Sequence, residues 1–397
     1  NCFCESMGGL TTTGATILES IGSVPRSLLL WRSLTQWLGG LGIVVLFVAV
    51  LPMLGVGSRR VYRIESAGPA PEGVKPRIQD AARILWYIYA GLTVAELIAL
   101  RLCGMSWFDA TCHTFATLAT GGFSTRDESM AAFPSPAIQS VVILFMLLAG
   151  INFGLYYQLL HRDWRSVRKD PELRVYLMIL LIATVIVTVS LYVGASGQTH
   201  DGGAPPSFAQ TLRDGLFQVV SIQTTTGFCT ADFDQWGFVA KATLLTLMFI
   251  GGMAGSTGGG IKVARIIIAA KVIIAEIEHV YRPNVVRPVK IGRSIIDADL
   301  KRNTLVYLLG IALLFGAGTG AIMVLESGND IDITTAATAS VATLNNIGPG
   351  LARVGVTQNY AWFTAPTKIL LSLLMLLGRL EMFTIVALLT PRFWREE

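Results

Sequence analysis

The feature that most limits how this chain can fold is a series of long apolar segments. Residues 137–160 read AIQSVVILFMLLAGINFGLYYQLL and contain no charged side chain. A helix needs about 20 mostly apolar residues to cross a bilayer. Further candidate spans occur at 36–57, 84–103, 175–195, 238–275, 304–325 and 366–390. Only 14% of the residues are charged, against about 25% in a soluble domain. We therefore predict an all-α polytopic membrane protein and exclude a soluble enzyme.

Basic residues predict the orientation of these spans. Lys and Arg are concentrated in three connections, 59–83, 162–174 and 262–302, and at the C-terminus. Such segments remain on the cytoplasmic side of a membrane. We expect a multi-pass plasma-membrane protein with a cytoplasmic C-terminus. The net charge of +5 then reflects membrane topology and predicts no binding of nucleic acid.

Four short runs rich in Thr, Asn and Gly recur along the chain. They are TTTGAT at 11–16, ATGGFS at 119–124, TTTGFC at 224–229 and NNIGPG at 345–350. Short semi-apolar stretches of the length typical of re-entrant segments precede them, such as DITTAATASVATL. The runs recur at intervals of roughly 100 residues, far longer than a solenoid period. We interpret them as parts of a membrane repeat around one shared axis.

The repeat predicts four pseudo-symmetric units around one central ion pore. Each unit would contain a helix, a re-entrant pore helix, a filter strand and a second helix. The expected boundaries are 1–63, 64–165, 166–290 and 291–397. The first unit has no spanning helix before its pore helix, so we expect the chain to be truncated before Asn1.

The chemistry of the four runs suits a monovalent cation. Backbone carbonyls in a re-entrant strand replace an ion's hydration shell, and Gly permits the backbone angles that this requires. Thr hydroxyls add oxygen ligands, and the C-terminal ends of the short helices favour positive charge. Four ordinary Gly-rich turns are the alternative. The predicted filter residues are Thr12, Thr13, Gly14, Thr120, Gly121, Gly122, Thr225, Thr226, Gly227, Asn346, Ile347 and Gly348.

Five strings together resemble the Trk/Ktr/HKT superfamily of potassium transporters, most closely its bacterial TrkH-type members. They are CESMGGLTTTGAT, ATLATGGFS, SIQTTTGFCT, GGMAGSTGGGIK and NNIGPG. The resemblance runs from Asn1 to about Thr390 and implies potassium uptake across the bacterial inner membrane. It also implies a homodimer and a cytosolic TrkA-type nucleotide-binding ring that acts in trans. It implies K⁺ as the transported ion, no covalently bound cofactor and no enzymatic activity.

The resemblance also indicates how individual positions act. Glu5 matches a family position in the first pore helix that we expect to hold the filter. The second and fourth runs depart from the pattern, because Gly121 and Ile347 stand where the others have Thr13 and Thr226. The predicted filter is therefore not fourfold symmetric, so its selectivity would be looser than that of a symmetric tetramer.

Residues 251–260 interrupt a candidate span with the sequence GGMAGSTGGG. Such a Gly content is incompatible with a stable helix. The resemblance implies an intramembrane gating loop beneath the filter, whereas the alternative is close helix packing of the GxxxG kind. The predicted gate residues in this segment are Gly251, Gly252, Gly255, Ser256, Thr257, Gly258, Gly259 and Gly260.

Arg379 lies well inside the apolar span 366–390. An intramembrane charge is costly and by default indicates a functional residue. The resemblance implies a positive barrier to cations below the filter. A structural role, in which Arg379 binds loop carbonyls, is the alternative, and the two roles are compatible.

Three other functions fit parts of the sequence. A coupled solute transporter with broken helices would have two inverted repeats, whereas we find four parallel runs. An intramembrane enzyme would need an acid–base, nucleophilic or metal cluster, and the His and Cys residues form none in the sequence. A sodium-permeable or sodium/potassium-permeable member of the same family remains open, although Gly at all four filter positions favours potassium. The sequence does not distinguish symport with H⁺ or Na⁺ from channel-like flux.

Overall fold

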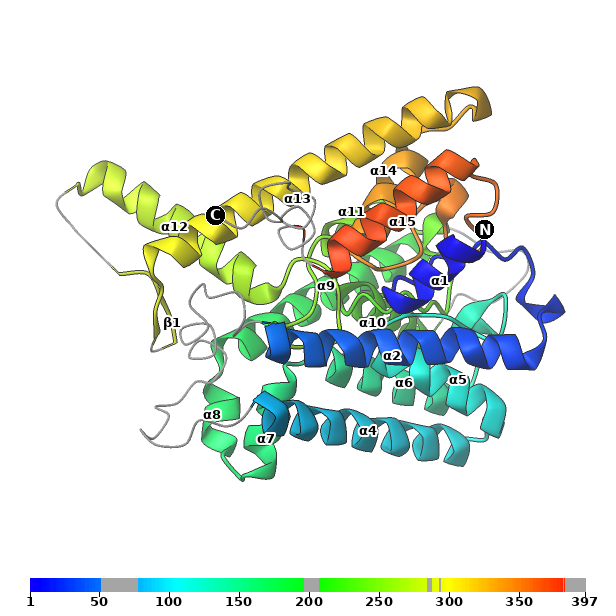
Figure 1. Cartoon of the computed structure of the whole chain (residues 1–397), viewed down its shortest axis with the longest axis horizontal. Helices are drawn as coiled ribbons and strands as arrows, with labels where there is room; N and C mark the ends of the chain where they lie inside the picture. The colour runs from blue at the N-terminus through cyan, green and yellow to red at the C-terminus, as the bar shows by residue number, and fades with distance from the viewer. Residues whose placement is uncertain (51–77, 196–206, 284–287, 293, 381, 383–397) are drawn as a thin grey trace, which may run out of the picture.

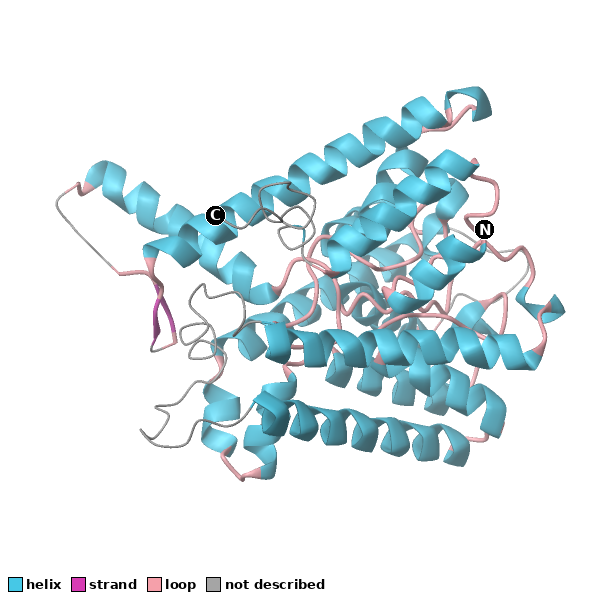
Figure 2. Cartoon of the chain, viewed as in Figure 1, coloured by secondary structure: helices cyan, strands magenta, loops and turns pink. Residues whose placement is uncertain are grey.

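Figure 1 shows the computed structural model of the chain, which describes residues 1–50, 78–195, 207–283, 288–292, 294–380 and 382. Helices form nearly all of the regular structure in this part of the chain. The two short strands in Figure 2 are β1 (Lys290–Ile291) and β2 (Ser294–Ile295), which pair as an antiparallel hairpin. The predicted all-α fold is confirmed.

The helices follow one another in a recurring order of long and short elements. In the first half they are α1 (Cys2–Leu10), α2 (Arg26–Val50), α4 (Ile78–Leu102), α5 (Trp107–Leu118), α6 (Pro136–Ala149), α7 (Phe153–Leu160) and α8 (Trp164–Lys169). In the second half they are α9 (Pro171–Ala195), α10 (Phe208–Gln223), α11 (Phe238–Leu247), α12 (Val263–Tyr281), α13 (Ala298–Leu325), α14 (Ile333–Leu344) and α15 (Ala365–Arg379). Single 3-10 turns lie at Ile21–Ser23, Ser129–Ala132, Phe233–Gln235, Ser327–Asn329 and Ala352–Val354.

Packing brings the first and the last helices of the described part of the chain together. Helix α1 packs on both α2 and α15, and α14 packs on α13 and α15. Helices α2 and α4 run side by side in Figure 1, while α12 and the hairpin extend away at the end opposite the N-terminus. The helix groups that contain the four Gly runs therefore surround a common interior.

Three described helices are long and apolar enough to cross a membrane: α4, α9 and α13. The outer face of α9 is an example of the apolar surface that such a helix presents. Leu177, Leu181, Val185 and Val189 lie one turn apart and are 47%, 66%, 53% and 55% exposed. A continuous apolar face of this kind is suited to lipid and not to water. The ends of two predicted spans, 51–57 and 383–390, lie outside the described residues.

The predicted span over 137–160 is not one continuous helix. The chain forms two helices there, α6 and α7, which are bent by 94° at a short break. Asn152 starts α7 as its N-cap, because its side-chain oxygen accepts a hydrogen bond from the Gly154 N–H at 2.6 Å. Hydropathy did not reveal this break, because Gly and Asn interrupt a helix without adding charge.

Candidate functional site

The four Gly runs adopt one backbone conformation. In each run the first and the third residue of a three-residue segment have positive φ, a region that L-residues other than Gly seldom occupy. The first residues are Thr12 (54°), Thr120 (54°), Thr225 (60°) and Asn346 (55°). The third residues are Gly14 (76°), Gly122 (76°), Gly227 (77°) and Gly348 (99°). All twelve predicted filter positions thus fall in four equivalent segments.

A short helix ends two residues before each segment and satisfies its amides. The helices are α1, α5, α10 and α14. The N–H of the middle residue donates to the carbonyl five positions earlier, at 2.8–3.0 Å, in all four segments. These bonds are Thr13 to Gly8, Gly121 to Ala116, Thr226 to Ser221 and Ile347 to Ala342. Since N–H groups are used on the helix side, the carbonyls are left for the interior.

The four segments form a closed ring. A Cβ atom on Gly14 would overlap the carbonyl oxygen of Gly121, and one on Gly122 would overlap that of Thr226. The same relation continues from Gly227 to Ile347, and from Gly348 back to Thr13. Each of these glycines therefore lies against the middle carbonyl of the next segment. Glycine is required here both by its φ and by this close approach.

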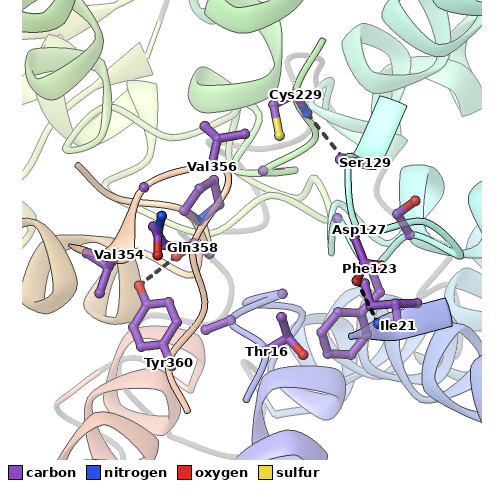
Figure 3. A pocket seen from close by; sticks show the side chains of 18 of the residues that line it. Thr16, Ile21, Phe123, Asp127, Ser129, Cys229, Val354, Val356, Gln358 and Tyr360 are labelled. Carbon is purple, nitrogen blue, oxygen red and sulfur yellow. Dashed lines mark hydrogen bonds between the residues drawn. The ribbon is translucent and has the colours of Figure 1, made fainter. Parts of the chain in front are cut away.

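Hydrogen bonds also join neighbouring runs on one side of the ring. The Ile21 N–H donates to Asp127 Oδ1 at 2.6 Å, and the Cys229 N–H donates to Ser129 Oγ at 3.4 Å (Figure 3). The remaining two junctions are closed by Ala352 N–H to Asp234 Oδ2 at 3.1 Å and by Tyr360 N–H to the Thr16 carbonyl at 2.8 Å. The ring is thus tied at all four junctions.

These links frame an open pocket that encloses about 570 Å³ when the solvent space at its mouth is included (Figure 3). All four ring glycines, Gly14, Gly122, Gly227 and Gly348, line it. Tyr360 lines the pocket, and its hydroxyl donates a hydrogen bond to the Gly348 carbonyl at 2.7 Å. The ring therefore forms the floor of an open vestibule.

Glu5 braces the first segment, as expected from its position in α1. Its Oε2 accepts the Ile17 N–H at 2.9 Å, and its Oε1 lies 2.7 Å from Arg32 Nη2. Arg32 in turn stacks over the Phe123 ring at 4.0 Å. In the second run His113 takes a comparable place, because its Nε2 lies 3.0 Å from Ser124 Oγ. Buried polar side chains therefore fix the chain just beyond the ring.

The predicted gating segment lies directly against the other side of the ring. The Thr120 hydroxyl donates to the Thr257 carbonyl at 2.9 Å, and the Gly259 N–H donates to Thr225 Oγ1 at 2.6 Å. A Cβ on Gly259 would lie 2.6 Å from the Asn345 carbonyl oxygen. The interruption spans the residues between α11 and α12, because α11 ends at 247 and α12 begins at 263.

Internal contacts shape this segment into a folded loop. The Gly251 N–H donates to the Ile261 carbonyl at 2.9 Å and the Val263 N–H to the Gly252 carbonyl at 3.2 Å. Two turns use positive φ, at Gly255 (72°) and Gly260 (66°). Further bonds run from Ser256 Oγ to the Met253 carbonyl and from Lys262 Nζ to the Gly258 carbonyl. The loop conformation, and not GxxxG helix packing, is what the structure contains.

Arg379 meets the loop at the C-terminal end of α15. Its Nη1 donates to the Thr257 carbonyl at 2.8 Å, and its Nη2 lies 3.4 Å from the Gly39 carbonyl. The side chain is only 6% exposed, and within the described residues no carboxylate pairs with this guanidinium, which is unusual for a buried charge. Thr257 therefore accepts from both the ring residue Thr120 and Arg379.

Two contributors to this region were missed by the sequence reasoning. The break between α6 and α7 receives the loop, since the Met253 N–H donates to the Gly150 carbonyl at 2.9 Å and the Phe153 N–H to the Gly255 carbonyl at 3.0 Å. At the start of α9, Glu172 Oε1 accepts the N–H groups of Ala254 and Ala264 at 2.8 and 3.1 Å. It thereby joins the two ends of the loop. The Gly-Ile-Asn string was the available signal for the break; nothing in the sequence marked Glu172.

A helical membrane protein with a fourfold ring of glycines above an intramembrane loop belongs to a narrow class of ion-transport proteins. Residues 2–395 match the TrkH family model, which is described as a cation transport protein. The chain belongs to this TrkH family.

Curated relatives and a solved structure agree with this assignment. The chain is 42% identical to the Trk system potassium uptake protein TrkH of Salmonella typhimurium, covering all of this chain and 80% of the relative. It is 34% identical to TrkG of Escherichia coli, covering 98% of this chain and 78% of that protein. The crystal structure of the potassium transporter TrkH from Vibrio parahaemolyticus superimposes with a TM-score of 0.85 at 37% identity, covering 99% of this chain and 78% of that chain.

Proposed function

We propose that the ring is a potassium filter and that the chain takes up potassium across the bacterial inner membrane. The observation that carries the proposal is the closure of four equivalent segments, each glycine lying against the next segment's carbonyl. Such a ring at the floor of an open vestibule is suited to replacing the hydration shell of a cation. The vestibule supplies the hydrated ion from outside.

The four short helices would assist dehydration. Helices α1, α5, α10 and α14 all end beside the ring, so their partly negative C-terminal ends are directed at the proposed ion path. No fuel is required for uptake, because an inside-negative potential supplies about 2.3 kcal/mol per charge per 100 mV. Transport would need no enzymatic chemistry.

The loop and Arg379 would form the gate beneath the filter. The loop backbone bonds to the filter residues Thr120 and Thr225, and Arg379 adds a positive charge to the same place. A cation that leaves the filter would meet both the loop and the guanidinium. Moving the loop would therefore require breaking the Thr257–Arg379 hydrogen bond.

A cytosolic TrkA-type ring would supply the force that moves the loop. The α12 helix begins directly after the loop and leads to the β1–β2 hairpin, away from the vestibule. The many basic residues of the segment 262–302 would face the cytoplasm, together with the C-terminus. We include a homodimer in the proposal because of the family relationship.

The direct test is rubidium uptake into proteoliposomes under an inside-negative potential. The purified protein should take up rubidium in preference to sodium, and Gly227→Ser should lose most of that preference. The substitution adds a side chain where the Ile347 carbonyl already lies. Uptake of sodium as readily as rubidium by the unmodified protein would favour the sodium-permeable alternative.

A further inference from the structure

Each of the four helices that follow the Gly runs carries a short sequence in the same register, within the helix or directly after its end. The strings are QWLGGL at 36–41, MLLAGI at 146–151, MFIGGM at 248–253 and MLLGRL at 375–380. The structure supports this register, because Gly39 and Gly378 both lie against the last carbonyl of their own short helix, that of Leu10 and that of Leu344. Gln36 therefore stands where the other three helices carry a buried methionine. These are Met146, Met248 and Met375, each at most 1% exposed.

Gln36 makes two hydrogen bonds to the second Gly run. Its Nε2 donates to the Gly121 carbonyl at 2.6 Å, and its Oε1 accepts the Phe123 N–H at 3.1 Å. Only one orientation of the amide satisfies both partners. The side chain is 0% exposed, so it has no access to water as an alternative partner. Gln36 therefore clamps the backbone on both sides of Gly122.

The second run lacks the brace that stabilises two of the others. In the first and third runs, the hydroxyl of the Thr in the middle of the three-residue segment forms a hydrogen bond with the hydroxyl of the Thr two residues earlier. These pairs are Thr11–Thr13 and Thr224–Thr226, each with an oxygen–oxygen distance of 2.8 Å. The corresponding residues of the second run are Ala119 and Gly121, which carry no hydroxyl. A Cβ on Gly121 would overlap the Gln36 amide group. The missing side chain and the inserted amide are thus complementary.

We propose that Gln36 is a specificity-determining residue of the filter, which fixes the direction of the Gly121 carbonyl and thereby the width of the ring at the second run. This inference rests on the proposed function of the ring as a filter. The Gly121 carbonyl lies against Gly14, so Gln36 also sets the junction between the first and second runs. Without the clamp that carbonyl is free to turn, and the ring accommodates a smaller cation more readily.

The test replaces Gln36 by the residue of the other three helices. Gln36→Met keeps an unbranched side chain of similar length but replaces the polar amide by an apolar thioether and so removes both hydrogen bonds. We expect the preference for rubidium over sodium in proteoliposome uptake to fall about tenfold, the effect of losing two buried hydrogen bonds, while total cation flux persists. The control is Gln139→Met on α6, which removes a buried Gln bonded to the Phe133 carbonyl at 3.2 Å and should leave the preference unchanged.

A pair of variants tests the complementarity by itself. Gly121→Ala alone should lower uptake, because its Cβ forces the buried Gln36 amide to shift. Gly121→Ala combined with Gln36→Ala should recover flux with reduced preference for rubidium. This pair of variants tests the role of Gln36 even if Gln36→Met fails to fold.

The possible failures are separable. If Gly227→Ser loses the preference while Gln36→Met keeps it, the role of Gln36 is overturned and the filter stands. If Gly227→Ser keeps the preference, the filter proposal itself is wrong. Failure of Gln36→Ala to rescue Gly121→Ala would contradict the proposed fit between the two residues.

Discussion

The four Gly runs have nearly the same backbone structure, whereas the four helices that follow them differ in length and continuity. The runs keep one conformation, with φ between 54° and 60° at the first position of all four segments, including 55° at Asn346. The following helices differ just beneath the ring. Helix α2 continues to Val50, α6 is bent by 94° into α7, α11 is separated from α12 by the loop, and α15 brings in Arg379.

Under the proposed function, this difference indicates that the ion filter needs symmetry and the gate does not. Binding an ion on an axis requires equivalent backbone from every side, so the φ pattern recurs even where the side chains differ. Obstruction requires one device only, and here one helix supplies the loop, another receives it and a third supplies the charge. Substitutions in the ring should alter ion preference and uptake, whereas substitutions around the loop should alter basal flux.

Gly122→Ala should abolish selective uptake of rubidium, as Gly227→Ser should at the equivalent position. The residue has φ of 76°, and the added Cβ would overlap the Thr226 carbonyl. Left-handed backbone alone costs an L-residue roughly 1–2 kcal/mol, before the overlap is relieved. Gly91→Ala is the matched control, because a Cβ there meets nothing within 4 Å. Selective rubidium uptake by Gly122→Ala at the rate of the control would show that the ring tolerates distortion.

Arg379→Ala should raise flux in the absence of any cytosolic partner. The variant removes the bond to the Thr257 carbonyl and the buried positive charge. A hydrogen bond to a charged group contributes about 1.5–3 kcal/mol, so the ratio of open to closed pores should rise about 10- to 100-fold. Deletion of residues 252–258 should give an even leakier pore. Exposed Arg302→Ala is the control, and equal flux in all three would place the gate elsewhere.

Glu172→Ala should also raise basal flux, by a smaller factor. It leaves the N–H groups of Ala254 and Ala264 without their shared acceptor, and an unsatisfied buried donor costs about 1–3 kcal/mol. Glu172→Gln keeps an acceptor oxygen and should retain most of the closure. The comparison is made by rubidium efflux from loaded vesicles. An equal leak in the Gln and Ala variants would indicate that the charge of Glu172, and not its hydrogen bonds, holds the loop.

Thr225→Val tests the direct link between ring and loop and should have the smallest effect. It deletes the hydroxyl that accepts the Gly259 N–H, a neutral hydrogen bond that contributes about 1 kcal/mol. Basal flux should rise several-fold with little change in ion preference. Thr243→Val on α11 removes a hydroxyl that bonds only within its helix and provides the comparison. A changed preference without a leak would assign Thr225 to selectivity alone.

The symmetric region was predictable from the sequence and much of the asymmetric region was not. Gly at a fixed place in four Thr/Asn-rich runs predicted the ring, because the required φ admits few other residues. The Gly content of 251–260 predicted an interrupted helix, and the family resemblance predicted the loop. By contrast, the bend at Gly150–Asn152 lies inside an uncharged segment, so hydropathy counted it as one span.

The polar clamps were also beyond sequence reasoning. Gln36 and Glu172 act through backbone groups 85 and 82 residues away in the chain, and no local pattern reports such a contact. The predicted domain boundary at 63/64 lies outside the described residues. Local backbone demands are thus visible in the sequence, whereas long-range hydrogen bonds from single side chains are not.

The most direct test of the central claim is to locate the ion. Crystals of the protein grown in rubidium, measured for anomalous scattering at the rubidium edge, should show a peak inside the ring. It should lie on the axis between the segments of Gly14, Gly122, Gly227 and Gly348. An empty ring beside a clear rubidium peak elsewhere in the membrane interior would contradict the account.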